Sequence, residues 1–211
     1  MTTDGLIRAL AADRQVRSPP WRIAATVLPL ALLAGLAALL LTLGSREDLW
    51  QSLAEPDSAL RFVLASAAGL IGLRLALLLA RPEGRWLVRL WPVAGIVPVA
   101  LAVLLWAWLV TPPEARQMAL MGKTIVTCLV AIPLLSILPV TALLATLRHG
   151  ATTAPALAGF AAGLGGSGLG AVIYALHCTE DSPLFWITWY GLAMIGVTLV
   201  STLIGARLLR W

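Results

Sequence analysis

The chain has 211 residues, of which 60% are hydrophobic and 12% are charged, and its formal net charge is +5. A soluble domain of this length cannot bury so much apolar surface, so the composition indicates an integral membrane protein with the lipid bilayer as its solvent. In such a protein an excess of arginine is typical of cytoplasmic loops. The positive charge therefore does not predict direct nucleic-acid binding.

Residues 1–22 form a polar segment ahead of the first apolar run. Thr3 or Asp4 can cap a short helix whose apolar residues recur at i, i+3 and i+4 spacing, namely Leu6, Ile7, Leu10 and Ala11. This apolar face can bind in the groove of a partner protein, or it can lie on the inner leaflet with the neighbouring arginines near anionic lipid. The next apolar run is too long for a signal peptide and lacks a clear cleavage site.

Six apolar runs follow, and each reaches about 20 residues, which is enough to cross the hydrocarbon core. The predicted spans are Ile23–Leu43, Leu60–Ala80, Leu90–Val110, Ala119–Leu147, Ala154–Leu176 and Leu184–Leu208. We therefore predict an all-α polytopic membrane protein with six transmembrane helices in one bundle. Residues 1–22 are the N-terminal segment and residues 23–211 the transmembrane domain.

Arginine is distributed unequally between the two sides of these spans. One side has ten arginines, and the other has three beside seven acidic residues. The first group is Arg8, Arg14, Arg17, Arg22, Arg81, Arg85, Arg89, Arg148, Arg207 and Arg210, and the second is Arg46, Arg61 and Arg116. The positive-inside rule then predicts cytoplasmic N and C termini and an outward-facing loop around residue 178. Arg74 and Lys123 fall near the ends of predicted spans, where long side chains can snorkel to the interface.

The fifth span contains glycines at spacings of four, three and four residues: Gly159, Gly163, Gly166 and Gly170. This spacing places them on one helix face, where small residues allow a neighbouring backbone to approach closely. Gly163, Gly165 and Gly168 also match a G-x-G-x-x-G pattern. No predicted strand precedes them, so we do not expect a dinucleotide site.

A short polar loop, HCTEDS at residues 177–182, separates the last two spans. It contains Cys178, and the other cysteine, Cys128, would lie about 13 Å past Ala119 in the outer leaflet. One hypothesis is that the two thiols sense an oxidant or a thiol-reactive metal, with His177, Glu180 and Asp181 as auxiliary ligands. A metal site would then comprise Cys128, His177 and Cys178, and no other cofactor is expected. The alternative is two unpaired cysteines, of which one is a small buried apolar residue.

Other classes of membrane protein are less well supported by the sequence. All ten acidic residues lie outside the middle of the spans, whereas proton-coupled transporters usually need an intramembrane carboxylate. A thiol–quinone oxidoreductase would normally need two pairs of redox-active cysteines, and no CxxC pair is present. The two histidines, His149 and His177, fall on opposite predicted faces, so we do not expect an enzyme. A transporter or channel and a membrane thiol oxidoreductase remain the alternatives.

The combination of tail, spans and loop resembles the NrsF family of bacterial inner-membrane anti-sigma factors. The resemblance rests on TDGLIRALAAD at residues 3–13 with a following PPWR, on a thiol in the fourth span, and on CTEDSPLF at residues 178–185 before Trp189-Tyr190-Gly191. Gly5 departs from the family pattern, which has a helix-favouring residue there, and glycine costs about 1 kcal/mol relative to alanine inside a helix.

This resemblance implies that the cytoplasmic N-terminal segment holds an extracytoplasmic-function (ECF) sigma factor of the sigma-F type at the inner membrane, away from RNA polymerase. It assigns sigma-factor binding to Asp4, Leu6, Ile7, Leu10 and Ala11, and it makes Cys128 and Cys178 the candidate signal-sensing residues.

Overall fold

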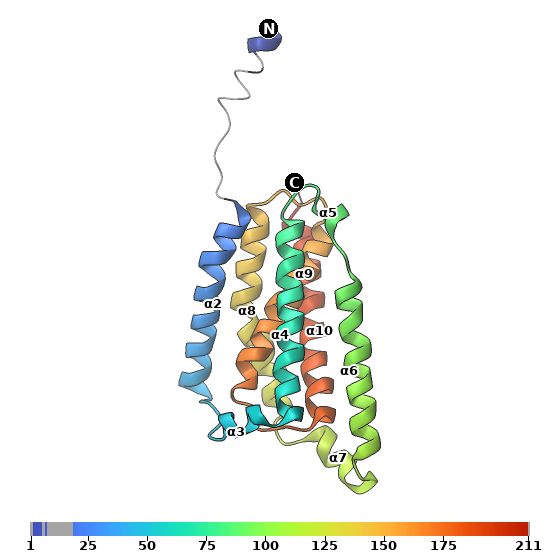
Figure 1. The fold of residues 1–211 in the computed structure, drawn as a ribbon. Helices are drawn as coiled ribbons and strands as arrows, with labels where there is room; N and C mark the ends of the chain where they lie inside the picture. Colours follow the sequence, from blue (N-terminus) through green and yellow to red (C-terminus); the bar gives the residue numbers. More distant parts are fainter. Residues whose placement is uncertain (1, 6, 8–18, 211) are drawn as a thin grey trace.

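In the part of the chain that the structure describes, six long helices form a bundle and three short ones lie in the connections (Figure 1). The computed structural model describes residues 2–5, 7 and 19–210. The long helices are α2 (Pro20–Thr42), α4 (Pro56–Leu79), α6 (Trp91–Val110), α8 (Ile125–Arg148), α9 (Pro155–Ala175) and α10 (Pro183–Leu208). All six are long and apolar enough to cross a membrane, and the described residues contain no strand. The prediction of an all-α fold with six spans is confirmed.

The short helices mark the two ends of the bundle. We call the end that holds the start of α2 and the last turn of α10 the terminal end, and α5 (Gly84–Leu87) also lies there (Figure 1). The opposite end carries α3 (Leu49–Ala54), α7 (Pro113–Met121) and the loop between α9 and α10, and we call it the α3/α7 end. The long helices α2, α4, α9 and α10 each begin with proline, whose missing N–H has no intrahelical partner to lose at the first position.

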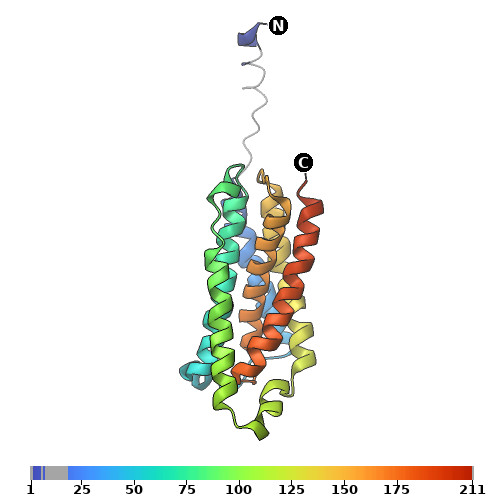
Figure 2. The ribbon, with the colours of Figure 1, turned by 90° about the vertical axis from the view of Figure 1, so that its right-hand side faces the viewer.

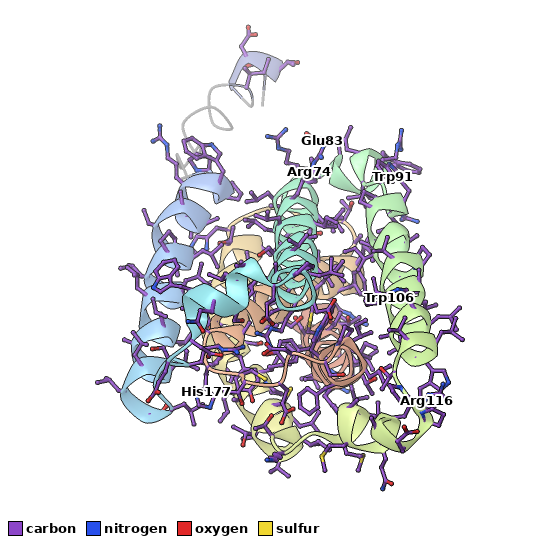
Figure 3. The ribbon with its side chains drawn as sticks, turned by 60° about the horizontal axis from the view of Figure 1, so that its bottom comes forward. Arg74, Glu83, Trp91, Trp106, Arg116 and His177 are labelled. Carbon is purple, nitrogen blue, oxygen red and sulfur yellow. The ribbon has the colours of Figure 1, made fainter. Side chains whose placement is uncertain are left out.

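The fourth span begins later than the sequence predicts. Residues 119–121 belong to α7, and α8 starts at Ile125 after a break at Gly122. Lys123 therefore lies exposed in the connection rather than within a span. Cys128 is the fourth residue of α8, roughly 5 Å from its start rather than 13 Å. Apolar residues lie on both sides of Gly122-Lys123-Thr124, so the sequence reading joined them into one span. Arg74 is exposed and lies towards Glu83 at the terminal end (Figure 3).

Helix α9 is the centre of the bundle and packs against α4, α8 and α10. Most of its side chains are buried because alanine and glycine dominate its sequence. A Cβ added at Gly163 would lie 2.7 Å from the Thr198 Cα in α10, and one added at Gly166 would lie 2.7 Å from the Val140 nitrogen in α8.

The four predicted glycines of α9 lie on one face of the helix, but this face meets two different helices along its length. Gly159 and Gly163 contact α10, whereas Gly166 and Gly170 contact α8. Gly168, the last glycine of the G-x-G-x-x-G pattern, contacts α4 at Gly69. The four glycines thus face α10 near the start of α9 and α8 further along it, whereas Gly168 lies on the opposite face, towards α4.

Helix α6 differs from the others because it packs loosely. It runs along the outside of the bundle (Figures 1 and 2), and Ala107 is its only buried residue. It contacts α4 and α10 and leads into α7.

The described part of the N-terminal segment includes two of the predicted binding residues. Residues 3–5 and 7 are helical, so Gly5 does not prevent the predicted helix there. Asp4 and Ile7 are exposed. The other predicted residues, Leu6, Leu10 and Ala11, lie outside the described residues.

Candidate functional site

Arg46 holds the loop between α9 and α10 in place at the α3/α7 end. It lies in the connection that follows α2, and its side chain is only 3% exposed. Its guanidinium donates to both carboxylate oxygens of Asp48, at 2.7 and 2.8 Å, and to both of Asp181, at 2.7 and 3.0 Å. It also donates to the Cys178 carbonyl at 3.1 Å, and the Arg46 N–H donates to the Leu176 carbonyl at 3.0 Å.

A second arginine contacts the same loop from α4. Arg61 is 1% exposed and donates from Nη1 to the Glu180 carbonyl at 2.8 Å. Its Nη2 donates to Ser58 Oγ at 3.1 Å and lies 3.5 Å from Asp181 Oδ1. Ser58 in turn donates to the same Asp181 oxygen at 2.9 Å, and its hydroxyl is 2.5 Å from that of Ser52. Asp181 is thus shared by two arginines and a serine.

This arginine network was not predicted from the sequence. There, Arg46 and Arg61 are only exceptions to the charge bias between the two faces. One signal was present: a basic residue on an arginine-poor, acid-rich face is expected to have an acidic partner. The sequence could not show which acid, because Arg46 and Asp181 are 135 positions apart.

Hydrogen bonds and neighbouring charges keep the arginine and aspartate side chains of the network ionised. Hydrogen bonds to Asp48 and Asp181 raise the pKa of Arg46 above its already high ordinary value. Burial raises the pKa of Asp181, but the hydrogen bonds from Arg46 and Ser58 and the nearby positive charges outweigh burial and lower it overall. Asp181 therefore remains ionised at neutral pH and continues to hold the loop.

The two cysteines lie in one buried cluster next to this network. Cys128 is 0% and Cys178 1% exposed, and both are free thiols. They pack with Tyr174, Phe185 and Tyr190, and the rings of the two tyrosines are 5.6 Å apart. The structure therefore brings together the thiols that the sequence placed in the fourth span and in the loop after the fifth, without a disulfide between them.

The side chains of His177 and Glu180 form hydrogen bonds with backbone groups and not with the thiols. The Nδ1 atom of His177 lies 3.0 Å from the Gly44 carbonyl oxygen, and its position at this end of the bundle is visible in Figure 3. The Glu180 carboxylate accepts from the Lys123 N–H at 2.7 Å. Both side chains thus fix connections to the loop.

The predicted metal ligands are not assembled in this structure. Across residues 2–5, 7 and 19–210, no three His, Cys, Asp or Glu side chains gather closely enough to hold a metal ion. Asp181 and Glu180, the predicted auxiliary ligands, are bound to Arg46 and the Lys123 N–H. Metal binding by Cys128, His177 and Cys178 stays a prediction that the structure does not support.

Gly122 allows the α7–α8 connection to approach the loop. Its φ is +54°, a backbone conformation that side chains disfavour, and an added Cβ would lie 2.7 Å from the Phe185 ring and 2.8 Å from Glu180 Cδ. The indole of Trp189 donates to the Leu120 carbonyl at 2.8 Å. The α2–α3 connection, the α7–α8 connection and helix α7 are therefore each bonded to the loop or to α10.

Comparison with known proteins identifies the family. The sequence model described as "NrsF: Negative regulator of sigma F" matches residues 10–211. The chain belongs to the NrsF family. The predicted resemblance is confirmed, and NrsF proteins are regulatory rather than enzymatic.

Two curated relatives of the NrsF family match over the whole length of both chains. One, named "Anti-sigma-F factor NrsF", comes from Caulobacter vibrioides and is 38% identical over 220 residues. The other, named "Probable anti-sigma-F factor NrsF", comes from Azospira oryzae and is 34% identical over 219 residues. No solved structure matches this chain.

Proposed function

We propose that the protein is a membrane-bound anti-sigma factor that sequesters an ECF sigma factor through its cytoplasmic N-terminal segment. Release would follow an envelope signal that acts near Cys128 and Cys178. The observation that carries the proposal is the match to the NrsF family over nearly the whole chain, together with two full-length relatives named as anti-sigma-F factors. The partner class is an ECF sigma factor, and the setting is the bacterial inner membrane.

The charge distribution supports cytoplasmic termini. The terminal end of the bundle carries Arg22, Arg81, Arg85, Arg89, Arg148, Arg207 and Arg210. At the α3/α7 end, two of the three arginines, Arg46 and Arg61, interact with Asp181. Positive charge is retained on the cytoplasmic side, which makes the terminal end the side of the sigma factor.

The exposure of Ile7 supports sigma-factor binding by the N-terminal segment. Its side chain is 58% exposed although it is apolar, which suits a residue that is buried only when a partner binds. Asp4 is exposed on the same short helical stretch. Leu6, Leu10 and Ala11 complete the apolar spacing of the segment.

The position of Cys178 supports a role in signal reception. Its carbonyl accepts from Arg46, and its thiol packs in the cluster with Cys128. A two-electron oxidant would convert the two thiols to a disulfide with loss of two protons, and a thiol-reactive metal ion would replace the thiol protons. Either change moves the loop that joins α9 to α10. The signal would act by favouring one packing of these helices over another, for which a few kcal/mol suffice.

Capture of the sigma factor by the full-length protein tests the proposal. Full-length protein in detergent should retain an ECF sigma factor of the same organism, and Ile7→Asp should weaken this binding by about tenfold or more. Thr2→Asp is the matched control, because it adds the same charge to the same segment outside the apolar spacing. Failure of the unmodified full-length protein to bind any ECF sigma factor would refute the proposal. Equal binding by all three proteins would refute the role of the segment.

A further inference from the structure

A long apolar cleft lies between α6 and the rest of the bundle. It has a volume of about 440 Å³ and is bounded by α4, α6, α9 and α10. Its walls are almost entirely apolar and include Ala68, Val97, Ala100, Ile187, Met194 and Leu199. This volume falls in the range of pockets that bind small ligands, about 300–1,000 Å³. The cleft exists because α6 packs loosely against its neighbours.

Two buried hydrogen-bond donors lie at one end of this cleft. Arg61 and Trp186, which are 1% and 3% exposed, line it near the α3/α7 end. Arg61 Nε and Trp186 Nε1 are both buried, and neither has a hydrogen-bond partner within the part of the chain that the structure describes. Buried donors are nearly always paired, because an unpaired donor loses its hydration without compensation. A molecule in the cleft that presents acceptor oxygens at this end would satisfy both donors.

The charge of Arg61 indicates that the acceptor is anionic. Its nearest carboxylate oxygen, Asp181 Oδ1, is 3.5 Å away and also accepts from Arg46 at 2.7 Å. Arg61 therefore shares one carboxylate with a better-placed arginine. The Nη atoms of Arg61 already donate to the Glu180 carbonyl and to Ser58, so its Nε–H and the Trp186 Nε1–H are the donors left for a ligand. Because a guanidinium is permanently charged and a carboxylate offers two acceptor oxygens, a carboxylate is the best match for this end of the cleft.

The length of the cleft indicates an acyl chain. Along α10 the lining extends from Trp186 to Leu199, which at 1.5 Å per residue is about 20 Å. That distance is somewhat more than one leaflet of a hydrocarbon core about 30 Å thick. A phospholipid fits less well, because its bulky head group cannot reach a side chain as buried as Arg61.

We propose that this cleft binds a long-chain fatty acid, with its carboxylate at Arg61 and Trp186 and its acyl chain between α6 and α10. Tyr190 lines the cleft and also packs in the cluster that contains both cysteines. The ligand would therefore adjoin the thiols. Binding of the fatty acid does not depend on the sigma factor, so the two proposals can fail independently.

Photo-crosslinking tests this assignment on the full-length protein in lipid nanodiscs. The probe is palmitate that carries a diazirine on its chain, and adducts are mapped by mass spectrometry. We expect adducts on cleft-lining residues of α6 and α10. Unlabelled palmitate should suppress them, whereas hexadecanol, which has the same chain without the carboxylate, and phosphatidylglycerol should suppress them far less.

Two glycines of α10 provide a blocking variant and its control. Gly191 lines the cleft, Gly196 lines a separate groove, and an added Cβ would meet no atom within 4 Å at either position. Leucine is tolerated in a helix better than glycine, so both variants should fold. Gly191→Leu should reduce labelling by about tenfold, the change produced by 1.4 kcal/mol, whereas Gly196→Leu should leave it unchanged.

Removing the donors tests the polar end of the cleft. Trp186→Phe keeps the ring but removes the N–H, and it should weaken palmitate binding by about fivefold, which corresponds to one hydrogen bond. Arg61→Gln, provided that it remains folded, should abolish the preference for palmitate over hexadecanol. Labelling that survives Gly191→Leu, or equal competition by hexadecanol or phosphatidylglycerol, would overturn the proposal.

Discussion

Arg46 Nη1 donates to Asp181 Oδ1 at 2.7 Å, across 135 positions of the chain. This contact joins the connection after α2 to the loop before α10, at the same end of the bundle where α4 and the α7–α8 connection also reach that loop. The α3/α7 end is therefore held together by polar contacts, whereas the rest of the bundle is held together by the close packing of small apolar residues.

Removing the guanidinium of Arg46 should destabilise the bundle. Arg46→Ala leaves Asp181 with only Ser58 and the more distant Arg61, and we expect a loss of about 2–3 kcal/mol in the free energy of unfolding. A fully buried pair would lose more, but the Asp181 side chain is 31% exposed. In a chain of this size the loss corresponds to a fall in Tm of about 5–10 °C, measurable in detergent. Arg89→Ala, at an exposed position, should change Tm little, and equal effects of the two variants would contradict the role of Arg46.

The lowered pKa of Asp181 predicts how stability depends on pH. Its folded-state pKa lies below the unfolded value of about 3.9. The stabilisation is therefore fully present above that unfolded value, and it is lost as the pH falls through the folded-state pKa. Tm should remain constant from pH 7 to about 5 and decrease below about 4. Asp181→Asn should start from a lower Tm at pH 7 and show a smaller decrease in acid, and a decrease as steep as that of the unmodified protein would exclude Asp181 as its source.

The cysteines are expected to be required for the response to a signal and not for sigma-factor binding. Cys128→Ser and Cys178→Ser should each retain the sigma factor in the absence of oxidant, because serine differs from cysteine by one atom at these buried positions. On treatment with diamide, which oxidises thiols to disulfides, the unmodified protein should release the sigma factor and both variants should not. Release that is unaffected in either variant would remove that cysteine from the mechanism.

Substituting a glycine of α9 should separate helices that now touch. A leucine at Gly163 would place its Cβ 2.7 Å from the Thr198 Cα, and backbone atoms cannot move aside without shifting α10. We expect Gly163→Leu to lower stability by about 3 kcal/mol or more. Gly95→Leu in α6, where an added Cβ meets nothing within 4 Å, should be neutral in the same thermal assay. A neutral Gly163→Leu would mean that α9 and α10 are less closely packed than the structure shows.

The proposed orientation can be tested with a membrane-impermeant maleimide on intact cells. In a Cys128→Ser/Cys178→Ser background, a cysteine at the exposed position of Thr179 should be labelled from outside. A cysteine at exposed Arg85, at the terminal end, should be labelled only after the membrane is permeabilised. Labelling of both positions or of neither in intact cells would contradict opposite locations for the two ends.

The sequence predicted the number of spans because length and hydropathy are properties of single segments. It did not predict the start of α8, since apolar residues flank Gly122-Lys123-Thr124 on both sides and the break depends on the positive φ of Gly122. For the same reason it placed Lys123 inside a span.

The arginine network could not be predicted because its partners are far apart in sequence. Arg61 meets the Glu180 carbonyl 119 positions away, and the spans alone do not fix which loops are neighbours. The sequence places Cys128 and Cys178 near the same side of the membrane, so it allowed the two thiols to be close. Whether they are close depends on how α8 packs against the end of α9, which the spans alone do not show. The loop itself was recognised by composition, as the one stretch that combines a thiol, an imidazole and two carboxylates.

The glycines of α9 have a mechanical consequence. Where two helix backbones are in direct contact, no change of side-chain rotamer can absorb a displacement. A movement of α9 is therefore passed on to the helices that pack against its glycines. We therefore expect a displacement at the Cys178 end of α9 to reach Pro155, at the opposite end of the helix, with little loss.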